Sequence, residues 1–369
     1  MPVRSGRSTP SRIDLDRRAS YQHLDPFGIL DFAVNFPEQV AEAARIGRKF
    51  TPPAGLRNPK SIVLAGMGGS AIAGDLLARL TEHRVPVPFL VCRDYDVPAL
   101  VGPGTLFIAS SVSGDTEETI SAARQARDRK AKLLCITTGG EIGAFAQREG
   151  LPLITLPRHD PNMPPRSALG YSLLPLVMAF ASLGLYPGAS GELRETLALL
   201  KSLCAQLHPD VPTAKNQAKR LALALFGKIP VVQGTNGIMA AAAYRWRTQL
   251  NENSKVLAIS SEYAELDHNE VVGWELPRAL GRRFEVIALT RPGDHPHTRE
   301  RITITTGMVA RKTKIHVLQA EGKSLLAQLL WAVCLGDFVS IYLAFLNRVD
   351  PASMDNINEL KKRLRERFG

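Results

Sequence analysis

The segment SIVLAGMGGSAIAGDLLARL, from Ser61 to Leu80, constrains the fold of this 369-residue chain more than any other part of it. An apolar run of strand length leads into a cluster of glycines, and the residues that follow have the apolar periodicity of a helix. This order is typical of a βα unit, in which a buried strand turns tightly into the helix that covers it. The segment therefore predicts the start of an α/β domain with a parallel sheet.

Strand-like and helix-like segments alternate after this unit. Strands are predicted at Val87–Cys92, Thr105–Ser111, Ala131–Thr138 and Leu151–Leu156, with helices over Thr116–Lys130 and, before the first strand, near Phe27–Ile46. Helical segments follow from about residue 167 to 226. Such alternation predicts a doubly wound parallel sheet with helices on both faces.

The second half of the chain repeats the order of the first. The segment from Phe284 to Ser324 contains a strand, a loop with the dipeptide GD, a helix and a strand, as does FIASSVSGDTEETI followed by KLLCITTGG. The repeat predicts two tandem α/β domains with doubly wound parallel sheets and flanking helices. We expect a flexible tail at residues 1–20, an N-terminal domain at 21–190 and a C-terminal domain at 191–369.

The net charge of +11 is a feature that nucleic-acid-binding proteins share. Five arginines against two aspartates give the first 18 residues a charge of +3, and the last ten residues, LKKRLRERFG, carry +4. The body of the chain is therefore only mildly basic, and it lacks a basic stripe interleaved with aromatic residues. We expect a small anionic ligand and no nucleic-acid partner.

Two features indicate a cytoplasmic protein without a membrane partner. The apolar stretch Ser324–Leu346 is interrupted by polar residues such as Gln328 and Asp337, which favours a buried helix over a membrane span. The four cysteines, at positions 92, 135, 204 and 334, are widely spaced in apolar segments. This spacing is expected of reduced core residues rather than of a disulfide framework or a zinc site.

The glycine loop after the first strand has two interpretations. Gly66, Gly68 and Ala71 match the dinucleotide-binding pattern GxGxxA, with Asp94 as an acid for the ribose. A tight turn between a strand and a helix needs the same glycines for backbone reasons alone. The glycines by themselves do not decide between these two interpretations.

Four hydroxyl groups crowd the loop after the strand Thr105–Ser111 and argue against a dinucleotide. Ser110, Ser111, Ser113 and Thr116 stand where a helix is predicted to begin, and the unpaired amides of a helix start attract phosphate. Hydroxyls and amides can surround a phosphate monoester without a metal, whereas a simple helix cap needs one hydroxyl. Because neighbouring parallel strands end at a common crevice, we expect both loops to meet there around a phosphate.

Five motifs occur in order along the chain: GMGGSAIAGD, SSVSGDTEET, MPPRSALGY, NENSK and ELDHNE. Together they resemble the bifunctional phosphoglucose/phosphomannose isomerases, which are built from two sugar isomerase (SIS) domains of flavodoxin-like fold. The resemblance covers about residues 60–365. It implies an isomerase that interconverts glucose 6-phosphate, and mannose 6-phosphate, with fructose 6-phosphate through an enediol or enediolate, with no cofactor and no metal.

The resemblance also implies which residues hold the phosphate. They are Gly68, Gly69 and Ser70 in the first loop, with Ser111, Ser113 and Thr116 in the second. The chain has Asp115 where the family has an asparagine. The charge of Asp115 would oppose a phosphate unless the carboxylate faces away or pairs with a cation.

Four catalytic residues are implied by the resemblance. Glu252 in NENSK is the base that moves a proton between two carbons, and Arg166 is the cation that stabilises the enediolate. His268 opens the sugar ring as acid and base, and it is contributed by the partner subunit of a homodimer. Lys361 carries a proton at the ring oxygen, although the neighbouring Lys362 leaves the choice between these two lysines open.

The residue patterns alone leave simpler explanations open. Glu252 could be a solvated loop acid, Arg166 a surface residue, and His268 an exposed or structural histidine. Asn251 and Asn253 favour a functional Glu252, because amides can orient a carboxylate without neutralising it.

Two other functions also stay open, and one candidate site is set aside. The protein could be a sugar-phosphate-binding regulator without catalysis, or a dehydrogenase that uses the GxGxxA-like turn. The pair His295 and His297 has no evident third ligand, so we expect no metal site there.

Overall fold

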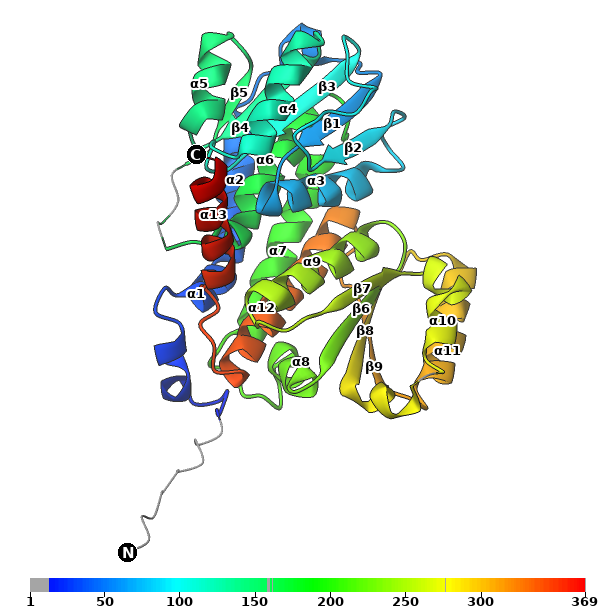
Figure 1. The fold of residues 1–369 in the computed structure, drawn as a ribbon. Helices are drawn as coiled ribbons and strands as arrows, with labels where there is room; N and C mark the ends of the chain where they lie inside the picture. Colours follow the sequence, from blue (N-terminus) through cyan, green and yellow to red (C-terminus); the bar gives the residue numbers. More distant parts are fainter. Residues whose placement is uncertain (1–12, 158–159, 161, 276, 369) are drawn as a thin grey trace, which may run out of the picture.

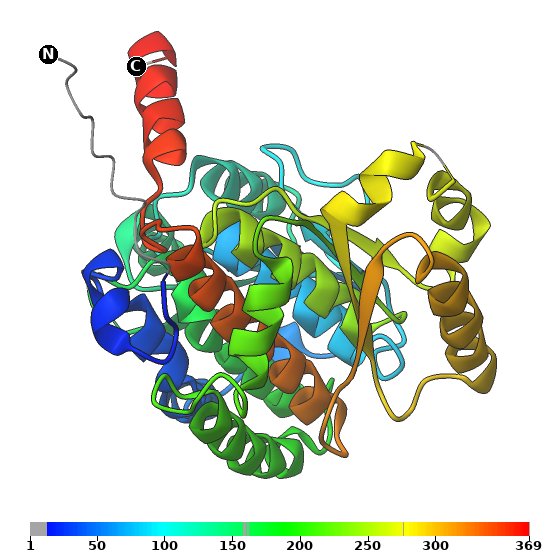
Figure 2. The same cartoon turned by 90° about the horizontal axis from the view of Figure 1, so that it is seen from below.

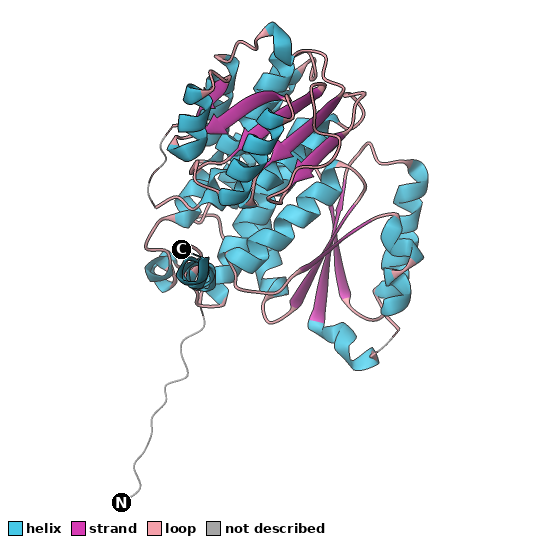
Figure 3. Ribbon diagram, turned by 45° about the horizontal axis from the view of Figure 1, so that its top comes forward, coloured by secondary structure: helices cyan, strands magenta, loops and turns pink. Residues whose placement is uncertain are grey.

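The computed structural model describes residues 13–157, 160, 162–275 and 277–368 of the chain. Two parallel sheets form the fold, with the strand orders β2-β1-β3-β4-β5 and β7-β6-β8-β9 (Figure 1). The first sheet contains β1 (Ser61–Ala65), β2 (Phe89–Cys92), β3 (Thr105–Ser110), β4 (Lys132–Thr137) and β5 (Leu153–Thr155). The second contains β6 (Ile229–Gly234), β7 (Ile259–Glu262), β8 (Phe284–Thr290) and β9 (Lys314–Gln319). Helices flank both sheets (Figure 3), so the predicted fold of two doubly wound parallel-sheet domains is confirmed.

Thirteen α-helices lie in the described residues. The N-terminal half has α1 (Ile29–Val34), α2 (Phe36–Arg48), α3 (Gly68–Thr81), α4 (Glu117–Asp128), α5 (Gly140–Arg148) and α6 (Leu169–Ser182). The remainder are α7 (Ala189–Leu207), α8 (Gln217–Leu225), α9 (Ile238–Glu252), α10 (Glu270–Gly273), α11 (Pro296–Val309), α12 (Leu325–Leu346) and α13 (Asp355–Phe368). Strands β2 to β5 each lie within their predicted segments. The predicted helix near 27–46 is instead two helices that meet at Asn35, because Pro37 favours a new helix start.

Strand β1 shows how the first sheet is covered on both faces. Ile62 and Leu64 pack into the large hydrophobic cluster with α3 and α6, whereas Val63 and Ala65 pack into a second cluster with α4 and α5. Alternate side chains of a strand point to opposite faces, so a run of five buried residues requires cover on both. The large cluster also contains residues of the second sheet, so the two sheets share one core. The domain boundary at 190/191 stays a prediction.

Helix α12 is the central helix of the second half. By length and composition it is the one helix of the described residues that could cross a membrane, but 94% of its most apolar window is buried inside the protein. It packs mainly against α7, α8 and α9, and it also contacts α1 and α3. The indole of Trp246 on α9 lies against Gly336, where an added Cβ atom would overlap Nε1, and this nitrogen donates to the carbonyl of Ala332 at 2.7 Å. Gly336 thus lets α9 approach α12 closely.

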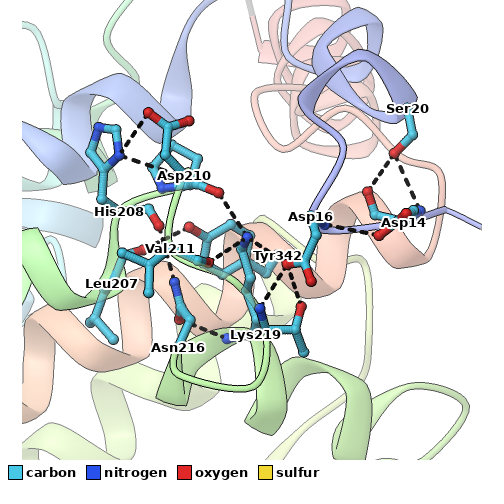
Figure 4. A network of polar contacts seen from close by, with 12 residues as sticks. Asp14, Asp16, Ser20, Leu207, His208, Asp210, Val211, Asn216, Lys219 and Tyr342 are labelled. Atoms are coloured by element: carbon cyan, nitrogen blue, oxygen red, sulfur yellow. Dashed lines mark hydrogen bonds and ion pairs between the residues drawn. The ribbon is translucent and has the colours of Figure 1, made fainter.

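The segment before α1 is packed against the body by one buried lysine. Lys219 on α8 has no exposed side-chain surface, and its ammonium donates to Asp16 at 3.1 Å and to the carbonyls of Pro209 and Val211 at 2.7 and 2.9 Å (Figure 4). Leu15 beside Asp16 is also buried. A flexible tail was expected at residues 1–20. Residues 1–12 lie outside the described residues. Residues 13–20 belong to the folded body, because Leu15 and Asp16 are packed against it.

The last helix, α13, stands out from the body (Figure 2). All of its described side chains, from residue 355 to residue 367, are exposed. The four cysteines, in contrast, are free and buried, as expected for core residues.

Candidate functional site

Two loops at the carboxyl ends of β1 and β3 carry the predicted phosphate ligands. Gly68, Gly69 and Ser70 form the first turn of α3, and Ser70 is buried. In the second loop the hydroxyl of Ser111 lies 2.9 Å from that of Thr116 and 3.5 Å from that of Ser113. Thr116 precedes α4 but its side chain does not cap that helix. The hydroxyls therefore contact one another across the loop, which leaves the first turn of α4 without a side-chain cap.

The carboxylate of Asp115 binds the next helix rather than these hydroxyls. Its Oδ1 accepts the backbone N–H of Glu141 at 3.0 Å, in the first turn of α5. A carboxylate is stabilised at a helix N-terminus, where amides are unpaired and the helix dipole is positive. The acid that departs from the family pattern thus has a structural partner of its own.

Gly69 connects the loop after β1 to the segment that carries Arg166. A Cβ atom at Gly69 would lie 2.9 Å from the carbonyl oxygen of Pro165. Pro165 begins the 3-10 helix Pro165–Ala168, so Arg166 follows this contact directly. The absence of a side chain at Gly69 therefore lets α3 approach the segment that carries Arg166 this closely.

Arg166 lies in the interior and is bonded on every side of its guanidinium group. Its side chain is 3% exposed, its Nη1 lies 3.4 Å from Oε2 of Glu252, and its Nε donates to Oδ1 of Asn253 at 2.6 Å. Its Nη2 donates to the carbonyls of Pro351 and Ala352, the latter at 3.2 Å. Burial lowers the pKa of Arg166, and the Glu252 carboxylate opposes that shift. Arg166 is therefore a buried residue, not the surface residue that its sequence context left open.

Glu252 is the last residue of α9, and its side chain is 33% exposed, so it is reachable from solvent. The expectation that the flanking asparagines orient this carboxylate is wrong. Asn253 instead binds Arg166 and donates to Ser340 at 2.9 Å, and Asn251 accepts the N–H of Ala258 at 2.9 Å. Amide side chains at a helix end pair with the nearest unsatisfied groups, which here are those of the arginine and the backbone.

Lys255 is a residue at the site that the sequence did not single out. Its Nζ donates to the carbonyls of Glu252 at 2.5 Å and Ser353 at 2.8 Å. Partial burial lowers the pKa of Lys255, and the charge of Arg166 lowers it further. Its position in NENSK, three residues after the acid, was the available signal.

A buried ion pair supports the arginine from behind. Arg245 on α9 is 2% exposed, and its Nη2 donates to the backbone carbonyl of Arg166 at 2.7 Å and to Asp337 on α12 at 3.2 Å. Gln249 donates to the same carboxylate at 2.8 Å. Burial raises the pKa of Asp337, while Arg245 and Gln249 lower it. The pair ties the segment that carries Arg166 to the central helix.

The structure does not bring His268 or Lys361 to this cluster within one chain. Helix α9 returns from the carboxyl end of β6 to the start of β7 and ends at Glu252, whereas His268 follows the opposite end of β7. His268 is exposed, and its side chain makes no hydrogen bond or ion pair with any residue that the structure describes. Lys361 is exposed on α13, as is Lys362, which lies 3.9 Å from Glu366.

Metal ligands do not cluster in the described part of the chain. No group of three or more His, Cys, Asp or Glu side chains there could hold a metal ion. His295 caps α11 by accepting the N–H of His297 at 3.2 Å.

Comparisons with known proteins match both halves of the chain. Residues 55–174 match the SIS domain model, and residues 214–364 match the bacterial phospho-glucose isomerase C-terminal SIS domain. The chain has the fold of a glucose-6-phosphate isomerase like protein from Thermus thermophilus, with a TM-score of 0.59 at 18% identity, over 93% of this chain and 99% of that one.

Two curated relatives extend over most of the chain. The bifunctional phosphoglucose/phosphomannose isomerase of Caldicellulosiruptor bescii is 40% identical over 333 residues, which are 90% of this chain and 97% of the relative. The protein of the same name from Thermoplasma acidophilum is 34% identical over 82% of this chain and 89% of the relative. The chain therefore belongs to the bifunctional phosphoglucose/phosphomannose isomerase family, a family of enzymes of the isomerase class.

Proposed function

We propose that the protein interconverts glucose 6-phosphate, and mannose 6-phosphate, with fructose 6-phosphate through an enediolate, without a metal ion. The observation that carries the proposal is the 3.4 Å approach of the Arg166 guanidinium to the Glu252 carboxylate. Gly69 joins this pair to the phosphate loop through its contact with Pro165. A base, a fixed cation and a phosphate-binding loop are the parts that this isomerisation needs.

The proposed steps use these groups in turn. The loops hold the phosphate through the hydroxyls of Ser111, Ser113 and Thr116 and the first turn of α3. Glu252 removes the proton from the carbon beside the carbonyl and returns it to the neighbouring carbon. Arg166, which its partners hold in one position, stabilises the negative oxygen of the enediolate, because a preorganised cation does not have to reorient during the reaction.

Ring opening is assigned to His268 of a partner subunit in a homodimer. The separation of His268 from Glu252 along the second sheet supports this assignment, since one chain alone does not unite them. Lys361 is proposed as the second proton carrier at the ring oxygen, and its place on an exposed helix requires α13 to move toward the site.

A coupled assay with fructose 6-phosphate as substrate tests the proposal. We expect both glucose 6-phosphate and mannose 6-phosphate as products, at rates that dialysis against EDTA leaves unchanged. Turnover that EDTA abolishes and a divalent cation restores would refute the metal-independent mechanism. Binding of fructose 6-phosphate without any product would instead identify a non-catalytic sensor.

A further inference from the structure

The second sheet has the strand order of the first, and this equivalence locates a second candidate site. In the orders β2-β1-β3 and β7-β6-β8, strand β6 corresponds to β1 and β8 to β3. The loop between β6 and α9 (residues 235–237) is then equivalent to the glycine loop, and the loop between β8 and α11 (291–295) to the hydroxyl-rich loop. Ligands of such sheets bind where strand order reverses, at the carboxyl ends of the two central strands.

A cavity of about 310 Å³ lies at these two loops. Thr235, Arg291, His295 and Thr298 line it from the second domain, and Arg79 lines it from the end of α3. None of the residues assigned to the isomerisation belongs to this cavity.

Thr235 gives the cavity a donor without a partner. Its side chain is 1% exposed, and its Oγ1 makes no hydrogen bond to any residue that the structure describes. A buried hydroxyl without a partner costs free energy, and most such groups in folded proteins are paired with protein, water or a ligand. Because Thr235 lines the cavity, a ligand oxygen there can supply the missing partner.

The start of α9 adds the N–H groups of Ile238 and Met239 at the same place, while the N–H of Ala240 already donates to the carbonyl of Thr235 at 2.8 Å. Gly237 precedes this 15-residue helix and provides no side-chain cap, so the first-turn amides have no cap from that position. The neighbouring helix α11 is capped by His295. The N-terminus of α9 is therefore the one of the two that can receive an anion, through its amides and its dipole.

The charges around the cavity are balanced by ion pairs within the protein. Arg79 lies 3.1 Å from Glu82 and 3.5 Å from Glu262, and Arg291 lies 3.4 Å from Asp294. Each acid is thus already paired with an arginine, and each guanidinium group has further N–H donors. This resembles the first site, where hydroxyls and amides rather than free cations face the phosphate.

We propose that this cavity is a second phosphate-binding site, which takes the phosphate group of a small metabolite or free inorganic phosphate. The Thr235 hydroxyl and the first turn of α9 bind the phosphate oxygens, and Arg291 provides a charged donor. The site is separate from the isomerisation site, so the proposal does not depend on the proposed reaction.

Isothermal titration calorimetry of the full chain with inorganic phosphate tests the proposal. We expect two phosphates per chain. Thr235→Val and Arg291→Gln should both weaken the same binding event, each by about tenfold, which is the effect of losing one hydrogen bond to a charged group. Ser113→Ala should weaken only the other event. The matched controls Thr303→Val and Arg301→Gln, both on α11 and outside the cavity, should change neither event.

Two further arms identify the ligand and separate this proposal from the isomerase activity. Glucose 6-phosphate that binds the Thr235 site more tightly than inorganic phosphate indicates a metabolite, and equal affinity indicates phosphate itself. Thr235→Val should also retain wild-type isomerisation of fructose 6-phosphate and an unchanged melting temperature, because the hydroxyl has no protein partner to lose. The absence of any phosphate-binding event that Thr235→Val and Arg291→Gln both weaken would overturn the proposal, whether one or two phosphates bind per chain. If the wild-type protein showed no isomerase activity, the proposed function would fail, but phosphate binding at the Thr235 site would still be supported by the calorimetry.

Discussion

Arg166 and Glu252 lie 86 residues apart in the chain and approach to 3.4 Å. Arg166 follows β5 of the first sheet, and Glu252 ends α9, the helix after the first strand of the second sheet. The pair therefore forms only when both halves are folded together. The packing of α9 on α12 therefore sets the geometry of the proposed base and cation.

Replacing the Glu252 carboxylate by an amide should stop the reaction without unfolding the protein. We expect Glu252→Gln to lower kcat by about 10²- to 10⁴-fold, the usual contribution of a general base, with the melting temperature unchanged. The control Glu321→Gln removes an exposed carboxylate elsewhere and should be neutral. Near-normal turnover by Glu252→Gln would contradict the assigned role.

Gly69→Ala should separate the phosphate loop from Arg166. The added Cβ would meet the Pro165 carbonyl at 2.9 Å, and this backbone oxygen cannot rotate away. We expect the KM for fructose 6-phosphate to rise about tenfold or more, because ångström-scale misplacement is costly in a preorganised site. Gly55→Ala is the matched control, since a Cβ at Gly55 would meet nothing within 4 Å. An unchanged KM in Gly69→Ala would show that this contact is unimportant.

The ion pair of Arg245 and Asp337 should position Arg166. Asp337→Asn leaves the buried Arg245 without its charge partner, so we expect a loss of about 3 kcal/mol in the free energy of unfolding and about a tenfold lower kcat with little change in KM. The double variant Arg245→Met with Asp337→Leu should recover stability because no buried charge remains. Its kcat should stay low, since the hydrogen bond to the Arg166 carbonyl is absent. Recovery of kcat together with stability would indicate a purely structural pair.

Mixing two inactive variants should test the shared histidine. When Glu252→Gln and His268→Ala subunits are dissociated and reassociated in equal amounts, half of the resulting dimers are heterodimers. Each heterodimer contains one site in which both residues are intact. We expect about a quarter of wild-type activity in such a statistical mixture. Reassociation without any recovered activity, in a mixture shown to contain heterodimers, would argue that both residues act from the same chain.

The anchor of the N-terminal segment should weaken in acid. Burial raises the pKa of Asp16, but hydrogen bonds from Thr213 and Lys219 outweigh burial and leave the pKa below its ordinary value of 3.8. The stability that this carboxylate contributes is therefore complete above 3.8 and is lost as the pH falls through the lower folded-state pKa. Asp16→Asn should lower the melting temperature at neutral pH, and its difference from wild type should shrink below pH 3.8. A difference that stays constant down to acid pH would contradict this origin.

Local patterns in the sequence were sufficient to predict the two parallel-sheet domains and the loops after β1 and β3, whose phosphate-binding role stays a proposal. The strand, glycine loop and helix at Ser61–Leu80 follow from periodicity and backbone sterics within twenty residues, so the prediction needed no tertiary information. The partners of Asn253 and Arg245 could not be predicted in this way. Their bonds depend on where α12 packs against α9, and that packing is set by close contacts such as Trp246 on Gly336.

The same limit applies to residues whose surroundings come from distant segments. Lys219 has an ordinary place in an amphipathic helix, and only the fold reveals that it is buried beneath Asp16. His268 has acidic neighbours in the sequence, yet none of these carboxylates forms an ion pair with its side chain in the described structure. Its proposed role depends on a surface that a single chain does not contain.

The carbonyls of Pro351 and Ala352, which bind Arg166, set a limit on how far the chain can be shortened. A protein that ends after Ser353 would lack α13 and Lys361 but keep both acceptors for the guanidinium group. A protein that ends before Pro351 would leave Nη2 of a 3% exposed arginine without these acceptors. A truncation or fusion point at this end therefore has to lie after Ala352. A cut before Pro351 alters the interior of the protein, because it removes acceptors of a buried arginine.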